Sequence, residues 1–146
     1  MKIYLDTSVY NRPFDDQTQP RIWMETLALA LVLQLVEAGE ATLVNSSVLE
    51  FENSRNPTAL RQDWMARCLE QSTAYQLVDE SIRKRAESLE KHGLKAIDAL
   101  HVACAESAGV DYLLTCDARL LKKQKHISVP SMNPLDFVQK VMGELP

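Results

Sequence analysis

Two aspartates follow short apolar segments and are the first candidates for chemistry. Asp6 ends the segment M-K-I-Y-L-D, in which Ile3 and Leu5 are strand formers, and two hydroxyl residues come next. Asp117 follows the apolar segment 111–115 closely. The carboxyl ends of parallel strands meet at one edge of a sheet, where ligands bind, so both carboxylates are predicted to lie there. Taken alone, Asp6 is better explained as the cap of a turn, but the other acidic positions reverse that preference.

A third aspartate, Asp98, stands early in an alanine-rich segment that is predicted to be a helix over 95–108. The side of this helix that is expected to face the core consists of Ile97, Leu100, Ala103 and Cys104. A charged carboxylate next to this apolar side of the helix costs free energy unless it is paired or binds a cation. The helix dipole also favours acidic residues in the first turn, and for Asp98 alone the two explanations are equally good.

The segment 46–53 contains two glutamates, of which a helix turns only one inward. Glu52 lies three and four residues after Leu49 and Val48, so it shares their apolar side. Glu50 shares a face with Asn53 and is expected to be solvated. We therefore predict that Glu52 is the glutamate of the pocket. A helix boundary displaced by two residues would favour Glu50 instead.

Carboxylates brought together in this way cannot all stay ionised unless a cation compensates their charge. Oxygen ligands favour a hard ion, so Mg²⁺ or Mn²⁺ is expected rather than zinc. An ion of this kind in an open, water-filled site suits the hydrolysis of a phosphodiester bond, because it activates water and stabilises the leaving oxygen. The predicted chemistry is therefore metal-dependent phosphodiester cleavage.

The elements that must position these acids alternate along the chain. Strands are expected at 3–5, 41–45, 74–78 and 111–115, with a final edge strand at 126–129. Helices are expected at 21–38, from Ser46 or Ser47, at 58–71, 80–91 and 95–108, in a short segment up to about 123, and from Pro134 onward, while 11–20 is expected to be a polar loop. This alternation predicts an α/β fold with a parallel central sheet of four to five strands and helices on both faces.

Composition narrows the class of protein. The 146 residues are enough for one domain, predicted over 1–146, and the net charge of −4 argues against binding nucleic acid through bulk positive charge. Three cysteines at spacings that match neither a disulfide framework nor a zinc site are expected to be free thiols. No signal peptide or membrane span is expected, because the longest apolar stretch is too short, so the protein is predicted to be cytoplasmic.

With the acids placed, the sequence resembles PIN-domain proteins of the VapC-like ribonuclease group over essentially its whole length. The pieces that carry the resemblance are L-D-T-S at the start, E-N-S-R-N-P, G-L-K-A-I-D-A-L-H-V-A, L-L-T-C-D-A-R-L-L and the closing N-P-L-D-F-V. Each piece is weak by itself, but their order and spacing together are fairly specific. The long loop 11–20 and the break at Arg55 to Pro57 depart from the family pattern and mark a subgroup.

The resemblance implies a three-layer α/β/α fold and an acidic pocket that binds Mg²⁺ or Mn²⁺. It implies that Asp6, Asp98 and Asp117 hold the metal and that Glu52, six residues after Ser46, completes the catalytic pocket. It further implies cleavage of single-stranded RNA, a homodimer, and an antitoxin partner that inhibits the protein. Thr7, Ser8 and Thr115 are plausible groups around the metal ligands.

Several alternatives stay open at this point. A haloacid dehalogenase type of phosphatase is disfavoured because its D-x-D motif would need an acid where Ser8 stands. A non-catalytic PIN module that binds RNA or protein through an acidic pocket is the main alternative. His101, three residues after Asp98, could touch the pocket, although a lone histidine on a helix is more often structural. Basic side chains that could contact a phosphate backbone are Arg12, Arg21, Arg55, Arg119, Lys122, Lys123 and Lys125.

Overall fold

The computed structural model describes residues 1–143, and its strands form one parallel sheet. The strands are β1 (Lys2–Leu5), β2 (Thr42–Ser46), β3 (Ala74–Gln76), β4 (Tyr112–Leu114) and β5 (Ser131–Met132), in the order β3-β2-β1-β4-β5. All four strand pairs are parallel, and β1 lies in the middle, where Ile3, Tyr4 and Leu5 are fully buried. Strands buried on both faces read as continuous apolar runs, as the sequence of β1 does.

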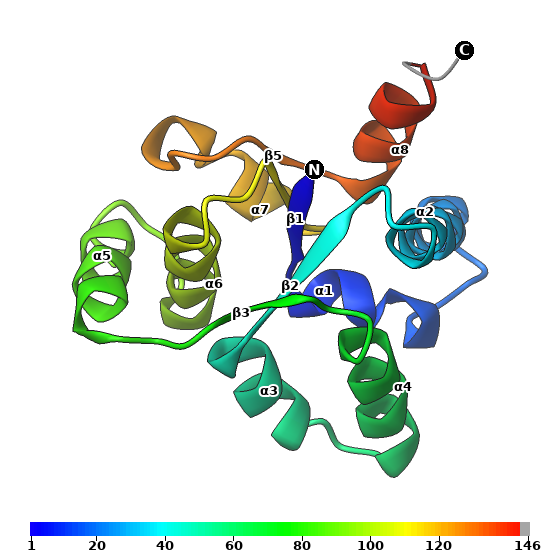
Figure 1. Cartoon of the computed structure of the whole chain (residues 1–146), viewed down its shortest axis with the longest axis horizontal. Helices are drawn as coiled ribbons and strands as arrows, with labels where there is room; N and C mark the ends of the chain where they lie inside the picture. Colours follow the sequence, from blue (N-terminus) through cyan, green and yellow to red (C-terminus); the bar gives the residue numbers. More distant parts are fainter. Residues whose placement is uncertain (144–146) are drawn as a thin grey trace.

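Helices cover both faces of the sheet and complete three layers. The helices are α1 (Thr7–Tyr10), α2 (Pro20–Glu37), α3 (Ser47–Ser54), α4 (Ala59–Leu69), α5 (Glu80–Glu90), α6 (Ala96–Ser107), α7 (Ala118–Leu121) and α8 (Pro134–Gly143), with short 3₁₀ turns at Arg12–Phe14 and Gln124–His126. Figure 1 shows α5 and α6 packed together on one side of the sheet and α2 and α8 packed together on the other. The predicted three-layer α/β/α fold is confirmed. The predicted domain extends to residue 146, and residues 144–146 lie outside the described ones.

The prediction of an edge strand at 126–129 is wrong, because the edge strand is β5, a few residues later. Ile127 and Val129 are buried apolar residues, which made the segment look like a strand. Their carbonyls, however, accept hydrogen bonds from the side chain of Gln124, at 3.3 and 2.9 Å. Pairing with β4 begins only at Pro130, whose carbonyl accepts from the backbone of Leu113 at 2.9 Å.

Capping residues and prolines explain where several helices begin. The hydroxyl of Ser46 and the carboxylate of Asp79 cap α3 and α5 by accepting from backbone amides three residues on. Pro134 opens α8 at its first position, as expected. The expected polar loop 11–20 contains the 3₁₀ turn Arg12–Phe14, because its proline fixes a helical φ there. Among residues 1–143, no helix combines the length and apolar character needed to cross a membrane.

Candidate active site

The four predicted acids line one cavity at the carboxyl edge of the sheet. Its volume is about 230 Å³, and its lining residues are Asp6, Thr7, Ser8, Asn11, Glu52, Asp98, His101 and Asp117. The four acids come from different parts of the chain: Asp6 follows β1, Glu52 lies on α3, Asp98 lies in the first turn of α6 and Asp117 precedes α7. Residues up to 111 positions apart in the sequence thus meet, because β1 and β4 are parallel neighbours and end together.

Hydroxyl groups join the ends of β1 and β4 beside Asp6. The hydroxyl of Ser8 donates to Asp6 Oδ1 at 2.5 Å and accepts from the backbone amide of Cys116 at 3.0 Å. The hydroxyl of Thr115 accepts from the backbone amide of Asp117 at 3.1 Å. These hydrogen bonds fix the two aspartates relative to each other, because Ser8 ties the turn after β1 to the turn after β4.

Glu52 faces the cavity because the cap at Ser46 sets the rotation of α3. The hydroxyl of Thr7 and Nε2 of His101 both hydrogen-bond to Oε1 of Glu52. Burial alone would raise the pKa of Glu52, but its hydrogen bonds to His101 and Thr7 and the charge of His101 outweigh burial and lower it. Glu52 is therefore held as a carboxylate in a fixed position.

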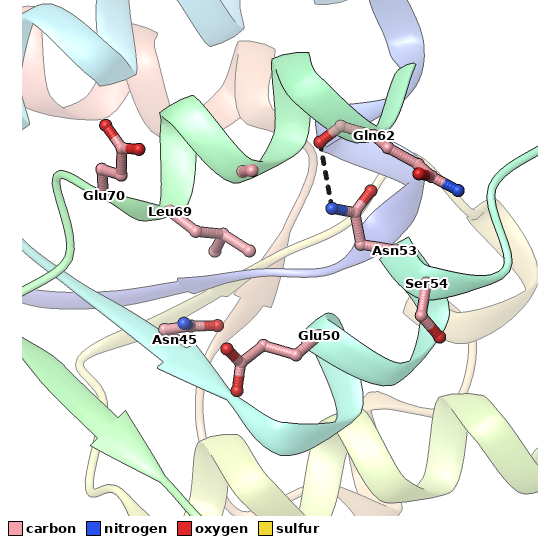
Figure 2. A pocket seen from close by; sticks show the side chains of 8 residues that line it. Asn45, Glu50, Asn53, Ser54, Gln62, Leu69 and Glu70 are labelled. Carbon is pink, nitrogen blue, oxygen red and sulfur yellow. Dashed lines mark hydrogen bonds between the residues drawn. The ribbon is translucent and has the colours of Figure 1, made fainter. Parts of the chain in front are cut away.

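Glu50 points away from this cavity, into a separate and larger hollow of about 510 Å³ between α3, α4 and β2. Figure 2 shows Glu50 in that hollow beside Asn45, with Asn53 bonded to the backbone of Gln62. The hydroxyl of Tyr75 donates to Glu50 on the protein surface. Glu52, which was predicted from the helix faces, is therefore the glutamate that lines the acidic cavity.

His101 is more closely connected to the cavity than the sequence indicated. The residue is 2 % exposed, and its Nδ1 lies 2.7 Å from the hydroxyl of Tyr4, which lies 2.7 Å from the hydroxyl of Ser46. The available signal was its position three residues after Asp98 on the same side of α6. The burial of its partner Tyr4 in the middle of the sheet could not be read from spacing alone.

Two aspartates of the cavity have raised pKa values. Asp6 is 4 % exposed, and burial raises the pKa of its carboxyl despite the opposing effects of His101 and Ser8. Burial also raises the pKa of Asp98, and the nearby carboxylates of Asp6 and Asp117 raise it further. Titratable groups with perturbed pKa values inside a cleft are typical of functional sites.

The geometry agrees with a comparison of the sequence against protein families. One family, described as "PIN domain", matches residues 3–126. The chain belongs to the PIN domain family. The predicted resemblance to PIN-domain proteins is therefore confirmed. PIN domains are generally nucleases, and an acidic cavity fits that class of enzyme.

Two solved structures share the fold of this PIN domain. One is VapBC2 from Rickettsia felis bound to a DNA fragment from their promoter, with 16 % identity, a TM-score of 0.58, and coverage of 91 % of this chain and 98 % of that chain. The other is PAE2754 from Pyrobaculum aerophilum, with 15 % identity, a TM-score of 0.58, and coverage of 99 % of this chain and 91 % of that chain. Identities this low support the fold alone. No curated protein matches the sequence.

The donor set of the PIN domain fits a divalent cation held partly through water. Within residues 1–143, the acidic, histidine and cysteine side chains form no closed set of three metal ligands. Mg²⁺ usually keeps several of its waters and takes only one or two protein carboxylates, so an open cavity suits it better than a closed cage. Burial raises the pKa values of Asp6 and Asp98, and neighbouring carboxylates raise that of Asp98 further, so a bound cation would favour the ionised forms of both.

Proposed function

We propose that this PIN domain is a metal-dependent endoribonuclease that cleaves phosphodiester bonds in single-stranded RNA. The observation that carries the proposal is the meeting of four carboxylates in one cavity of about 230 Å³, at the sheet edge where α/β proteins bind ligands. The family supports the nuclease class. RNA is the proposed substrate, and Mg²⁺ or Mn²⁺ is the proposed cofactor.

In this proposal the three aspartates and the glutamate have different roles. Asp6, Asp98 and Asp117 hold the cation directly or through water, and the ion supplies charge compensation and an activated water for attack on phosphorus. Ser8 and Thr115 keep the carboxylates of Asp6 and Asp117 in place through the hydrogen bonds described above. Glu52, which His101 and Thr7 fix as a carboxylate, orients the attacking water.

The test is cleavage of end-labelled single-stranded RNA by the purified chain, with Mg²⁺, with Mn²⁺ and with a chelator. We expect cleavage only with a divalent ion. Asp6→Asn and Glu52→Gln are expected to reduce the rate at least about a hundredfold, since each removes a group that acts on the reacting atoms. Glu50→Gln is the matched control, because its side chain lies in the other hollow, and it is expected to cleave normally.

The outcomes separate the proposal from its main alternative. If the wild-type chain binds neither Mg²⁺ nor Mn²⁺ in calorimetry and cleaves no RNA, the cavity belongs to a non-catalytic module that binds RNA or protein. If Glu50→Gln is the inactive variant and Glu52→Gln is active, the nuclease remains but the assignment of Glu52 is wrong.

The biological role that we propose is the toxin of a toxin-antitoxin pair. The support is the fold shared with VapBC2 of Rickettsia felis, together with the PIN family assignment. Expression of the wild-type chain should then arrest growth, and expression of Asp6→Asn should not. A small protein encoded beside it should restore growth and co-purify with it. Growth arrest by Asp6→Asn would separate toxicity from cleavage and contradict this role.

We also propose that the protein is a homodimer through α2. This helix leaves an apolar stripe of four side chains exposed, namely Trp23, Met24, Leu27 and Leu31. Contiguous exposed apolar patches are typical of protein interfaces. The helix that carries the stripe lies on the side of the sheet where α2 and α8 pack together.

A further inference from the structure

The acidic cavity is the middle part of a longer trough. A hollow of about 360 Å³ on one side shares Asp98 and Asp117 with the cavity, and we call it the basic arm. A hollow of about 410 Å³ on the other side shares Thr7, Asn11 and Glu52 with it, and we call it the aromatic arm. Because each arm shares lining residues with the acidic cavity, both arms adjoin the acids.

The basic arm concentrates positive charge in a protein whose net charge is −4. Its cationic lining residues are Lys95, Arg119, Lys122 and Lys123. Within residues 1–143, none of the four forms an ion pair with an acidic side chain, whereas Arg12 is paired with Asp15 and Glu25. Lysine and arginine side chains without such partners are suited to phosphate groups. The structure thus separates Arg119, Lys122 and Lys123 from Arg12, with which the sequence had grouped them.

One of these side chains lies close to a glycine that lines the basic arm. Gly93 has a φ of +96°, and a Cβ placed on it would come within 2.9 Å of Nζ of Lys123. The positive φ favours glycine at this position, and the absence of a side chain leaves room for the end of Lys123. This approach places the ammonium group of Lys123 over the loop between α5 and α6, beside the start of the helix that carries Asp98.

The aromatic arm offers flat, weakly hydrated surfaces instead of isolated charges. Phe51 is 52 % exposed, and the guanidinium of Arg55 lies over its ring, 5.0 Å from the centroid. Ile97 also lines this arm. Unpaired bases stack on aromatic rings and on arginine planes, while bases inside a duplex are already stacked on each other. The Oδ1 atom of Asn11 is buried and accepts no hydrogen bond from residues 1–143, so it is a free acceptor at the junction with the cavity.

We propose that single-stranded RNA lies along this trough, with a base against Phe51 and Arg55 and a backbone phosphate in the basic arm. This inference rests on the proposed function for the identity of the ligand. It adds two separate subsites of different chemistry, each of which adjoins the acidic cavity. The two subsites make different predictions, because phosphate binding releases counterions and base stacking does not.

The experiment measures RNA binding separately from cleavage. Every variant carries Asp6→Asn, and fluorescence anisotropy of a labelled single-stranded RNA is recorded with a chelator at several salt concentrations. In this background, Lys122→Gln with Lys123→Gln should weaken binding several-fold and lower the slope of log affinity against log salt by about 0.7 for each phosphate group that the protein no longer neutralises. The control is Arg83→Gln with Lys84→Gln, which removes the same charge from the exposed face of α5 and should leave the slope unchanged.

Phe51→Ala in the same background should weaken binding about fivefold or more without changing the salt slope, since stacking involves no counterion. Its control is Leu60→Ala, which removes another exposed apolar side chain, 69 % exposed on α4, and should bind normally. A fully paired RNA duplex should not respond to Phe51→Ala. Thermal unfolding of each variant verifies that the fold is kept.

Some outcomes overturn the inference. If the lysine pair behaves like the Arg83 and Lys84 control, the basic arm is not a phosphate subsite and is free for another ligand, such as an acidic segment of a protein partner. If Phe51→Ala behaves like Leu60→Ala, no base stacks there, and absence of any RNA binding overturns both subsites. If both arms respond as expected while the wild-type chain never cleaves RNA, the inference stands and the proposed nuclease activity fails.

Discussion

The hydroxyl of Tyr4 lies 2.7 Å from Nδ1 of His101, and this hydrogen bond links the central strand to the acidic cavity. The same hydroxyl lies 2.7 Å from that of Ser46, which accepts from the backbone amide of Leu49 at 3.1 Å. With a neutral His101, Ser46 donates to Tyr4 and Tyr4 donates to Nδ1 of His101; with a charged His101, Nδ1 donates to Tyr4 and Tyr4 donates to Ser46. In both cases Nε2 of His101 donates to Glu52. The cap of α3 and the orientation of Glu52 are therefore parts of one network.

The first prediction concerns Tyr4→Phe, which removes the hydroxyl and keeps the ring. We expect kcat for RNA cleavage to fall about tenfold with KM nearly unchanged, because His101 no longer has the hydrogen bond that fixes its orientation toward Glu52. The free energy of unfolding should fall by about 1–3 kcal/mol, since buried polar groups are left without a partner. Steady-state kinetics and urea unfolding measure the two effects.

Tyr75→Phe is the matched control for Tyr4→Phe. The hydroxyl of Tyr75 donates to Glu50 on the surface and does not touch the acidic cavity. This variant should keep kcat and lose little stability, because an exposed hydrogen bond is replaced by water. Equal kcat values for the two variants would show that the network behind His101 has no influence on the reaction.

Patterns local in sequence predicted most of the fold and the four acids. The apolar run 3–5, the helix starts at Ser46 or Ser47 and at 80, and the helical spacing of Glu52 from Val48 and Leu49 each depend on neighbours along the chain. What escaped prediction depends on interactions between distant segments or side chains. His101 gains its role from Tyr4 in another element, and the segment 126–129 is not a strand because the side chain of Gln124 takes its carbonyls. That the chain forms a single domain over 1–146 stays a prediction.

The second prediction concerns Glu25, which is fully buried on α2 and joins three elements. Its Oε1 accepts from Nε and Nη2 of Arg12 at 2.9 and 2.7 Å, and its Oε2 accepts from the side chain of Asn133, next to the start of α8. Glu25→Ala should lower the free energy of unfolding by about 3–5 kcal/mol, because it leaves the Arg12 guanidinium without its buried partner. Urea unfolding measures the change.

Glu37→Ala is the control for the buried ion pair. Glu37 is exposed at the end of the same helix and forms no ion pair with residues 1–143, so its removal should change stability by less than about 0.5 kcal/mol. If the two variants unfold at the same urea concentration, the ion pair between Arg12 and Glu25 contributes nothing to stability and the first loop is held by other interactions.

The third prediction tests the proposed homodimer. Leu27→Glu places a charge in the middle of the apolar stripe on α2, where Leu27 is 45 % exposed. Light scattering should show a dimer for the wild-type chain and a monomer for this variant, because a buried unpaired charge opposes association. Leu60→Glu on α4 is the control and should stay dimeric. A dimer that persists in Leu27→Glu would place the interface on another surface.

The last prediction concerns pH and follows from the raised pKa of Asp6. Burial makes the folded chain bind the Asp6 proton more tightly than the unfolded chain does, so stability falls as pH rises from the unfolded pKa, near 4, up to the raised folded value. Asp98 acts in the same direction. Glu52 acts oppositely, because its lowered pKa gives stability that is present above its unfolded pKa and lost in acid.

Asp6→Asn isolates the contribution of Asp6, since the amide keeps an acceptor for Ser8 and cannot ionise. Urea unfolding with a chelator should show that Asp6→Asn gains stability over the wild-type chain between pH 4 and pH 7, by about 1.4 kcal/mol for each pKa unit that separates the folded and unfolded carboxyl. Added Mg²⁺ should then stabilise the wild-type chain and have little effect on the variant, because the cation compensates the buried carboxylate. If wild type and variant keep the same stability difference at every pH, Asp6 titrates normally, and the buried charge that a cation would compensate is absent.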